Sequence, residues 1–263
     1  MRRPGRGVTA VIVVHVVCYL LMYVMGDIVA PADEIAGLLA LHAPSVIRGH
    51  VWQLVTGPLF HAPGDIFGLA INMVWLFFLG PQLESMLGTR KFLQTYAWAM
   101  AGAVALSMVV GLLGSIVGLG PFWDRLWGTH HLGATGAILG LLACWVGRMG
   151  DRVAHFALLG PMQARTFGII VLGIVLLLMF ITPGSSASMH LGGMAMGYAI
   201  GTGRWPRDKK RSELVAKKKQ LEKELRRFEV IEGGRAGEPK SDDERPRGWT
   251  GWGGDGNGGP TVH

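Results

Sequence analysis

The sequence predicts an all-α membrane protein, consisting of a bundle of six transmembrane helices, a basic cytoplasmic helix and a disordered tail. The first observation is composition: 50% of the 263 residues are hydrophobic, 16% are charged, and the mean hydropathy is +0.35. Such a chain is too apolar for a soluble domain of this size. The second observation is a series of apolar segments between charged or Gly/Pro-rich breaks. They cover about residues 8–26, 66–83, 92–114, 132–149, 166–182 and 187–203.

The first apolar segment follows the basic sequence MRRPGR, as the apolar region of a secretory signal peptide would. Its apolar stretch, residues 8–25, is longer than that region usually is, so an uncleaved membrane anchor is expected. Several of the six segments are close to or below the ~20 residues that span a bilayer. We therefore expect tilt or partial burial within a bundle to accommodate them.

Lys and Arg predict the orientation, because cytoplasmic loops are enriched in both residues. Basic residues are frequent before the first segment, in the second and fourth loops and after the sixth segment. These residues are Arg2, Arg3, Arg6, Arg90, Lys91, Arg148, Arg152, Arg165, Arg204, Arg207, Lys209, Lys210 and Arg211. Loops one, three and five together contain only Arg48 and Arg125. The pattern predicts a multi-pass protein of a bacterial inner membrane or an equivalent membrane, with both termini in the cytoplasm.

Composition divides the chain into a membrane domain, residues 1–203, a basic segment, residues 204–232, and a tail, residues 233–263. The tail is rich in glycine and polar residues and is expected to be disordered. The basic segment carries much of the net charge of +7, so this charge does not require a nucleic-acid partner.

Within the basic segment, eleven basic residues up to position 227 stand against five acidic residues up to position 229. Leu214, Leu221 and Phe228 recur every seven residues. This pattern favours an amphipathic cytoplasmic helix that lies on anionic lipid. A short coiled coil is the alternative, supported by a single seam over two heptads.

Two histidines, His15 and His190, fall inside predicted spans, where an ionisable side chain is costly and often functional. For His15 we expect a hydrogen bond between helices. His190 is followed at helical spacing by Gly193, Gly197 and Gly201, so these four positions share one helix face. A glycine face of this kind allows another helix backbone to approach closely.

The fourth segment offers a matching surface, because Gly136 and Gly140 are spaced as GxxxG. If the two glycine faces pack together, Thr135 and His190 meet, since both lie ~5–7 Å below the outer ends of their helices. A hydroxyl beside an imidazole is the arrangement of a nucleophile and its general base. The alternative for Thr135 is a hydrogen bond to a carbonyl of its own helix.

Other polar residues in or near the spans have different expected roles. Asn72 lies ~10 Å below the outer end of the second segment, where its amide is placed to donate to an oxyanion. An interhelical hydrogen bond is the alternative for Asn72. His130 and His131 are adjacent but have no further ligands nearby, so we predict no metal site and no cofactor. Cys18 and Cys144 fall in apolar segments and are expected to be buried, reduced thiols.

Four motifs occur in order between residues 51 and 201. They are VWQLVTGPLFHA, NMVWLFFLGPQLESMLGTRKFLQTY, GATG and HLGGMAMG. Together with six predicted helices, they resemble the rhomboid family of intramembrane serine proteases. The first resembles the entry into the family's second helix, and the second resembles the end of that helix and the following loop, including Glu84, Gly88 and Lys91. GATG stands at the place of the family's GxSG, and HLGGMAMG fits its HxxGxxxG.

The resemblance implies a six-helix bundle that cleaves other membrane proteins near the outer face. Thr135 then holds the position of the nucleophilic serine, and His190 that of the general base. Gly133 introduces the nucleophile motif. Asn72 fits the asparagine of helix two that stabilises the oxyanion.

The sequence departs from the family pattern at two positions. Thr135 keeps the hydroxyl but adds a methyl group that restricts its rotamers, although threonine is the nucleophile of other enzymes. The family's histidine four residues before Asn72 is replaced by Gly68. Loss of one oxyanion donor typically costs about 10²–10³ in rate. His61 precedes Gly68, at a spacing two residues longer than the usual one.

Two functions remain open at this point. The first is an intramembrane endopeptidase with a threonine nucleophile, favoured by the presence of Thr135, His190 and Asn72 in one chain. The second is a pseudoprotease that binds transmembrane clients without cleaving them, favoured by the two departures. The predicted partners are therefore transmembrane substrates or clients, together with anionic lipid. A small transporter is disfavoured, because the sequence has neither an internal repeat nor a charge pair in mid-membrane.

Overall fold

The computed structural model describes most of the chain outside the C-terminal region. The described residues are 3–118, 130–156, 160–181, 186–204 and 209–225. The chain divides into two compact units, residues 1–212 and 213–263, and each is considered by itself. The predicted disordered tail, residues 233–263, lies outside the described residues.

Each of the six predicted apolar segments contains a helix. These helices are α1 (Arg6–Ile28), α5 (Ile66–Leu87), α6 (Thr89–Val117), α8 (Thr135–Met149), α9 (Ala164–Ile181) and α10 (Ala187–Gly201). Among the described helices, α1, α5 and α6 are long and apolar enough to cross a membrane, and α8 and α9 are shorter apolar helices. Helix α11 (Lys209–Leu225) lies within the basic segment.

The connections contain structure that the sequence did not predict. The first loop holds three short helices, α2 (Ala32–Leu39), α3 (Ala43–Ile47) and α4 (Gln53–Leu59). An antiparallel hairpin of β1 (Val153–Phe156) and β2 (Gly160–Gln163) joins α8 to α9. The hairpin is an addition in one loop to a structure that is otherwise mostly helical, as the all-α prediction expected. Gly150 and Gly160 have φ angles of 58° and 71°, which let the chain leave α8 and turn into β2.

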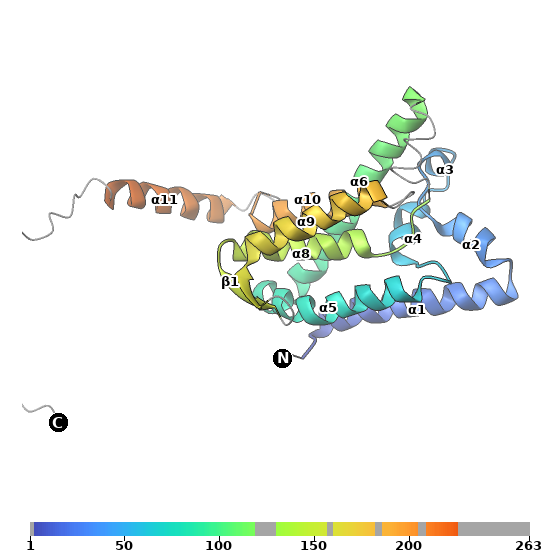
Figure 1. The fold of residues 1–263 in the computed structure, drawn as a ribbon, viewed down its shortest axis with the longest axis horizontal. Coiled ribbons are helices and arrows are strands. Elements are labelled where there is room, and N and C mark those ends of the chain that lie inside the picture. Colours follow the sequence, from blue (N-terminus) through green and yellow to red (C-terminus); the bar gives the residue numbers. More distant parts are fainter. Residues whose placement is uncertain (1–2, 119–129, 157–159, 182–185, 205–208, 226–263) are drawn as a thin grey trace, which may run out of the picture. The chain divides into compact units, whose positions relative to one another are not determined.

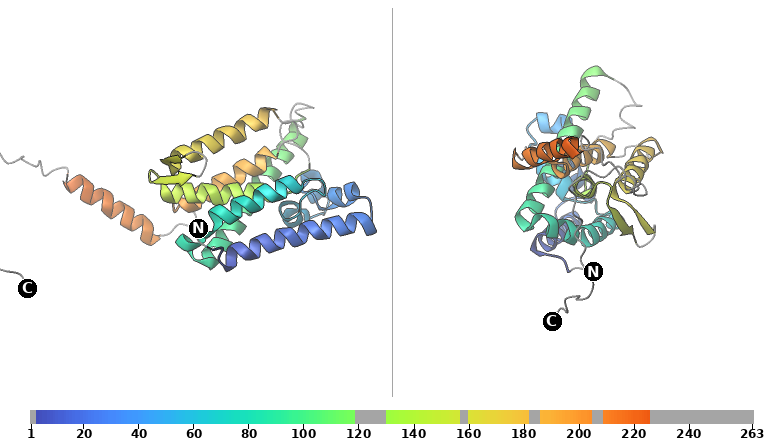
Figure 2. Two further views of the ribbon diagram at one scale, coloured as in Figure 1. Left: turned by 60° about the horizontal axis from the view of Figure 1, so that its bottom comes forward. Right: turned by 90° about the vertical axis from the view of Figure 1, so that its left-hand side faces the viewer.

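Helix α8 is the central helix of the bundle. It packs against α4, α5, α6, α9 and α10, while α1 runs beside α5 on the far side of α5 (Figures 1 and 2). Ten of the fifteen residues of α8 are buried. In contrast, α1 and α9 each have an outward face with many exposed aliphatic side chains. This distribution is typical of a bundle whose peripheral helices face lipid.

Glycines allow α8 and α10 to touch through their backbones. A Cβ atom built on Gly136 would lie 2.7 Å from the Met189 carbonyl oxygen, and one built on Gly140 would lie 2.7 Å from that of Gly193. On α10, a Cβ atom at Gly193 or Gly197 would collide with the carbonyl oxygen of Gly136 or Gly140. Residue numbers increase together along both helices, so α8 and α10 run parallel. The predicted contact between the two glycine faces is thus confirmed.

A buried carboxylate ties α1 to the corner between α5 and α6. Glu84 of α5 accepts hydrogen bonds from the backbone amides of Gly7 (2.9 Å) and Val8 (3.1 Å), and from the hydroxyl of Thr89 (2.7 Å). The two amides belong to the first turn of α1, where no intrahelical acceptor exists. Glu84 therefore caps α1 from another helix, and these bonds offset the cost of its burial.

The glycine contact predicts a large effect of one substitution. Gly193→Leu should push α8 and α10 apart, because the new side chain meets the Gly136 backbone, which cannot move aside. We expect the melting temperature in detergent to fall by roughly 5–10 °C. Leu139→Ile, a swap of equal volume on α8, serves as the control and should change it by less than about 3 °C. Equal melting temperatures for wild type and Gly193→Leu would show that the contact contributes nothing to stability.

Candidate active site

Thr135 is the first residue of α8, and its hydroxyl is bonded to another helix. Its Oγ1 accepts a hydrogen bond from Asn72 Nδ2 at 3.1 Å. The same hydroxyl can donate to Asn72 Oδ1, which lies 3.3 Å away. The sequence left open a hydrogen bond from Thr135 to its own helix. The described hydrogen bonds of this hydroxyl instead cross to α5, so Thr135 belongs to an interhelical polar contact.

The segment before Thr135 is fixed by backbone hydrogen bonds. His131 and Leu41 form an antiparallel bridge, with N···O distances of 3.0 and 2.9 Å. Gly133 donates from its amide to the Gly57 carbonyl at 2.9 Å and has a φ of +116°, a conformation that favours glycine. These bonds set the point at which α8 begins, and with it the position of the Thr135 hydroxyl.

Asn72 is buried between two partners. Its Nδ2 lies 3.1 Å from Thr135 Oγ1 and 3.1 Å from His61 Nε2, and its side chain is 2% exposed. The NH₂ group of Asn72 has two N–H donors, so it can donate one hydrogen bond to each partner. Gly133 also lies beside His61, since a Cβ atom built on Gly133 would be 3.6 Å from His61 Nε2. The structure therefore brings His61, Asn72, Gly133 and Thr135 together.

Gly68, one turn before Asn72, has a local structural reason to lack a side chain. The Asp65 carboxylate caps α5 by accepting a hydrogen bond from the Gly68 amide at 3.0 Å. A Cβ atom at Gly68 would lie 2.5 Å from Asp65 Oδ1, so a larger residue there displaces the cap. The imidazole beside Asn72 comes instead from His61, in the segment between α4 and α5.

His61 connects this group to a second buried histidine. Its ring meets that of His15 edge to face, with 5.6 Å between the ring centroids. His15 is bonded through Nδ1 to the Leu59 carbonyl (3.0 Å) and through Nε2 to the Tyr96 hydroxyl (2.6 Å). The predicted interhelical hydrogen bond of His15 is thus confirmed, with Tyr96 of α6 as one partner.

Burial lowers the pKa of His61 to about 4, so its ring is neutral at pH 7. A neutral ring has one N–H donor and one acceptor nitrogen. When Nε2 accepts from Asn72, the proton is on Nδ1. Within the described residues, His61 Nδ1 is buried and has no hydrogen-bond partner. His61 therefore acts on Asn72 as an acceptor that fixes the orientation of the amide.

His190 is the fourth residue of α10, and its level is set by the glycine contact. Met189, its neighbour, touches Gly136 next to Thr135, so His190 and Thr135 lie on facing turns of parallel helices. The described hydrogen bonds of the Thr135 hydroxyl go to Asn72 rather than to His190. Thr135 begins α8 and so does not lie ~5–7 Å below the end of its helix, as the sequence had predicted. The structure brings α8 and α10 into contact at Gly136 and leaves the hydroxyl on the Asn72 side.

Ser186 connects His131 to His190, because it forms a hydrogen bond with each of them. Its Nδ1 is 3.0 Å from Ser186 Oγ, and the Ser186 carbonyl accepts from the His190 amide at 3.0 Å. Burial, together with the nearby His190, His130 and His42, lowers the pKa of His131 to about 4. His42 and His130 stack with 4.3 Å between their ring centroids.

In the described part of the chain, no group of three or more His, Cys, Asp or Glu side chains is arranged to hold a metal ion.

A cavity of 570 Å³ opens at this end of the bundle. Its lining comes from α2 and from the segments before α5, α8 and α10: Asp33, Ala36, Gly37, Ala40, Ala62, His130, Leu132 and Ser186. Ala62 follows His61, and Leu132 separates His131 from Gly133. The cavity is thus lined by residues next to His61 and Gly133 in the chain.

Three residues of this region, His61, His131 and Ser186, are not indicated as site residues by the sequence pattern. The expected spacing argued against His61, because it lies two residues too far from Asn72. Pro63, Gly64 and the Asp65 cap take up this extra length before α5 begins. The position of His131 depends on its bridge with Leu41, which no local pattern indicates.

The chain is similar in sequence to known proteins of one family. A family model described as "Rhomboid domain" matches residues 48–207. The "Putative rhomboid protease YdcA" of Bacillus subtilis (strain 168) is 28% identical over 155 residues, which cover 59% of this chain and 68% of that protein. The "Rhomboid-like protease 3" of Toxoplasma gondii is 26% identical over 212 residues, which cover 74% of this chain and 68% of that protein. Because the family model matches more than half of the chain, this protein is a multi-pass membrane protein of the rhomboid family.

Proposed function

We propose that the protein is an intramembrane endopeptidase that cleaves transmembrane proteins near the outer membrane face, with Thr135 as nucleophile and His190 as general base. Rhomboid proteins act on transmembrane proteins, and both relatives are named as proteases. The observation that carries the proposal is the 3.1 Å hydrogen bond between Asn72 Nδ2 and Thr135 Oγ1. In this bond the Asn72 amide donates to the Thr135 hydroxyl. Thr135 is the first residue of α8, and α8 packs against α10, the helix that carries His190.

In the proposed reaction, the Thr135 hydroxyl turns from Asn72 toward His190 and gives its proton to the imidazole as it attacks the scissile carbonyl. The Asn72 amide, released from the hydroxyl, donates to the oxyanion that forms on the carbonyl oxygen. His190 then protonates the leaving amine, and the acyl group stays on Thr135. Water entering from the 570 Å³ cavity, deprotonated by His190, hydrolyses this ester and restores the hydroxyl.

In this proposal, His61 is a positioning residue for Asn72. An amide that rotates freely is a poor oxyanion donor, because catalysis by electrostatic stabilisation needs donors that are already oriented. The 3.1 Å contact with His61 Nε2 holds the Asn72 amide at a fixed angle. His61 in this way takes over part of the role of the histidine that Gly68 replaces.

The second candidate function is a pseudoprotease that binds transmembrane clients without cleaving them. The observation in its favour is that the Thr135 hydroxyl is occupied by Asn72, while its methyl group restricts the χ1 rotation toward His190. The two candidates share fold, partners and site residues. They differ only in whether Thr135 reaches His190 during the reaction.

We propose six membrane crossings with both termini in the cytoplasm. The alternation of Lys and Arg between loops supports this orientation. Thr135 and His190 then lie near the outer face, together with the cavity that adjoins them. We further propose that the basic segment, residues 204–232, binds anionic lipid at the cytoplasmic surface, because its basic residues follow directly after α10.

The roles of Thr135 and His190 can be tested with purified protein in lipid and generic transmembrane substrates. Thr135→Ser should preserve or raise cleavage, since it keeps the hydroxyl and removes the methyl group. Thr135→Val and His190→Ala should each reduce kcat by at least about 10³-fold, and the double variant should be scarcely worse, because a dyad acts as a unit.

Other outcomes of this series are equally informative. Continued cleavage by Thr135→Val would show that the threonine has only a structural role. Cleavage by Thr135→Ser with none by wild type would establish the pseudoprotease, with its remaining site intact.

Removing the His61 ring, as in His61→Ala, should lower kcat about 10²-fold with little change in KM, because Asn72 loses its orientation.

The pH dependence gives a second test of His61. Since the pKa of His61 is lowered to about 4, its ring is neutral above that pH and becomes protonated as the pH falls through it. A protonated Nε2 no longer accepts from Asn72, so wild type should lose activity near pH 4, beyond the loss seen in His61→Ala. His50→Ala, outside the site, is the control. An unchanged kcat in His61→Ala contradicts the positioning role.

Orientation is measured with reporter fusions. A reporter after Gly201 should be cytoplasmic, and one in the first loop, residues 27–65, should be external. Both reporters on one side of the membrane would be incompatible with six crossings.

A synthetic peptide of residues 204–229 should bind anionic vesicles and be released by salt. Each Lys or Arg near the surface contributes about 1 kcal/mol, and this attraction is screened as ionic strength rises. Vesicle co-sedimentation measures the effect, with neutral vesicles as the control. Equal binding to neutral and anionic vesicles would argue against the electrostatic interaction.

A further inference from the structure

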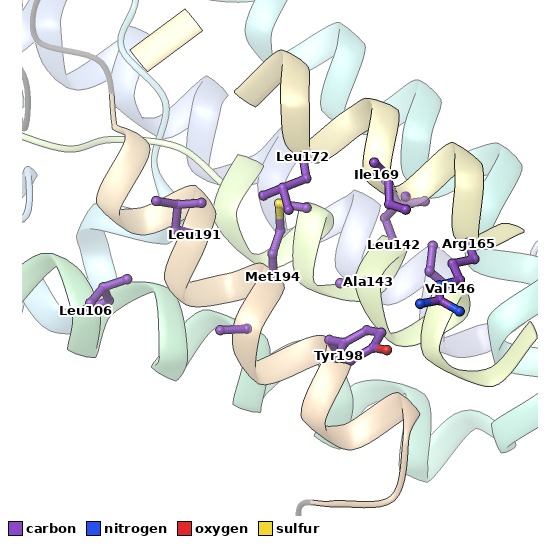
Figure 3. Close-up of a pocket in the computed structure, with 12 residues that line it drawn as sticks. Leu106, Leu142, Ala143, Val146, Arg165, Ile169, Leu172, Leu191, Met194 and Tyr198 are labelled. Atoms are coloured by element: carbon purple, nitrogen blue, oxygen red, sulfur yellow. The ribbon is translucent and has the colours of Figure 1, made fainter. Parts of the chain in front are cut away.

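A second cavity, of 560 Å³, lies between α9 and α10, with α8 as its floor. Figure 3 shows aliphatic side chains from these three helices around it, with Leu106 of α6 on one side. The principal apolar residues of its walls are Leu142, Val146, Ile169, Leu172, Leu191 and Met194. We call this cavity the α9–α10 groove. None of the candidate active-site residues lines it.

Small residues create the groove. Helix α9 rests on α8 at Gly168, where an added Cβ atom would lie 2.9 Å from Val146 Cγ1. Beside this close contact, Ala143 on α8 and Ala195 on α10 have side chains too short to fill the space between the helices. The groove is therefore a space that the short side chains of packed helices leave unfilled. Its walls are apolar and favour apolar groups of a ligand.

The polar groups of the groove come from Arg165 and Tyr198. Arg165 belongs to the first turn of α9 and Tyr198 to the last turn of α10, and Figure 3 shows both at the same end of the groove. Arg165 pairs with Asp151 at 3.9 Å, but both side chains are more than 70% exposed, so this pair contributes little. The guanidinium is thus available to an anionic group at the mouth of the groove.

The shape and polarity of the groove match a lipid acyl chain with an anionic headgroup. The groove follows α10 from Leu191 to Tyr198, a distance of about 10 Å. Its walls are apolar along this length, and its charged lining residue, Arg165, lies at one end. A hydrocarbon chain can lie along such a groove with its phosphate at that end.

We propose that the α9–α10 groove binds an anionic glycerophospholipid, with an acyl chain along the apolar walls and the phosphate at Arg165 and Tyr198. The guanidinium offers paired N–H donors to phosphate oxygens, and the phenol adds a third donor. The polar end lies at the Arg-rich ends of α8 and α9, so the lipid comes from the cytoplasmic leaflet, where anionic headgroups meet juxtamembrane basic residues. This site is independent of the proteolytic activity proposed above.

The test uses the full-length protein in detergent, with phosphatidylglycerol or phosphatidylcholine of identical acyl chains. Native mass spectrometry measures the lipid retained, and a phosphatidylglycerol with a photoreactive acyl chain marks the site. Arg165→Gln removes the charge, and Ala195→Phe fills the groove from an exposed helix position without disturbing the core. The matched controls are Arg90→Gln and Ala101→Phe, two exposed positions of α6 outside the groove.

Arg165→Gln should weaken retention of phosphatidylglycerol about fivefold, equivalent to about 1 kcal/mol, and leave phosphatidylcholine unchanged. Ala195→Phe should reduce retention of both lipids, and the photoreactive chain should label α9 or α10. Both controls should behave as wild type. The proposal is overturned if Arg165→Gln and Arg90→Gln have equal effects, if Ala195→Phe retains both lipids, or if the label falls only on residues 209–225.

Discussion

The backbone contact between α8 and α10 is the constraint on which the rest of the structure depends. Glycines on both helices bring carbonyl oxygens to distances at which any side chain would collide. In a bilayer, where helices gain little from the hydrophobic effect, such close packing is a main source of association. It also sets the relative level of the two helices, because Gly136 and Gly140 of α8 lie against Gly193 and Gly197 of α10. The level of Thr135 against His190 follows from that register.

Around this apolar contact, the bundle holds an uninterrupted group of polar side chains. Thr135, Asn72 and His61 are joined by hydrogen bonds, and His61 meets His15 ring to ring. Buried polar groups are costly unless they are bonded to one another, and almost all of these are. Among the four side chains of this group, the described atom that is buried without a partner is Nδ1 of His61. The cavity at the ends of α8 and α10 is lined by Ala62, the residue that follows His61 in the chain.

Sequence alone predicted the features that depend on local periodicity. The glycine face of α10, the matching pair on α8 and the helix in each apolar segment all repeat at intervals that a single helix determines. The contact of His61 with Asn72 could not be predicted from spacing, because it depends on how the chain enters α5, through the Asp65 cap and the two preceding residues. The bridge between Leu41 and His131 joins segments far apart in the chain, and the hairpin after α8 forms in a polar loop without a periodic pattern.

The order of synthesis gives the α8–α10 contact a further consequence. Helix α8 leaves the ribosome before its main partner exists, and the chain must still add the hairpin, α9 and the start of α10. During that interval the glycine face of α8 is exposed to lipid or to any other helix with small residues. The bundle is completed only when α10 has been made, so a nascent chain that stops before Ala187 lacks the surface that closes the fold. Such a chain lacks His190 together with the glycine face against which α8 packs.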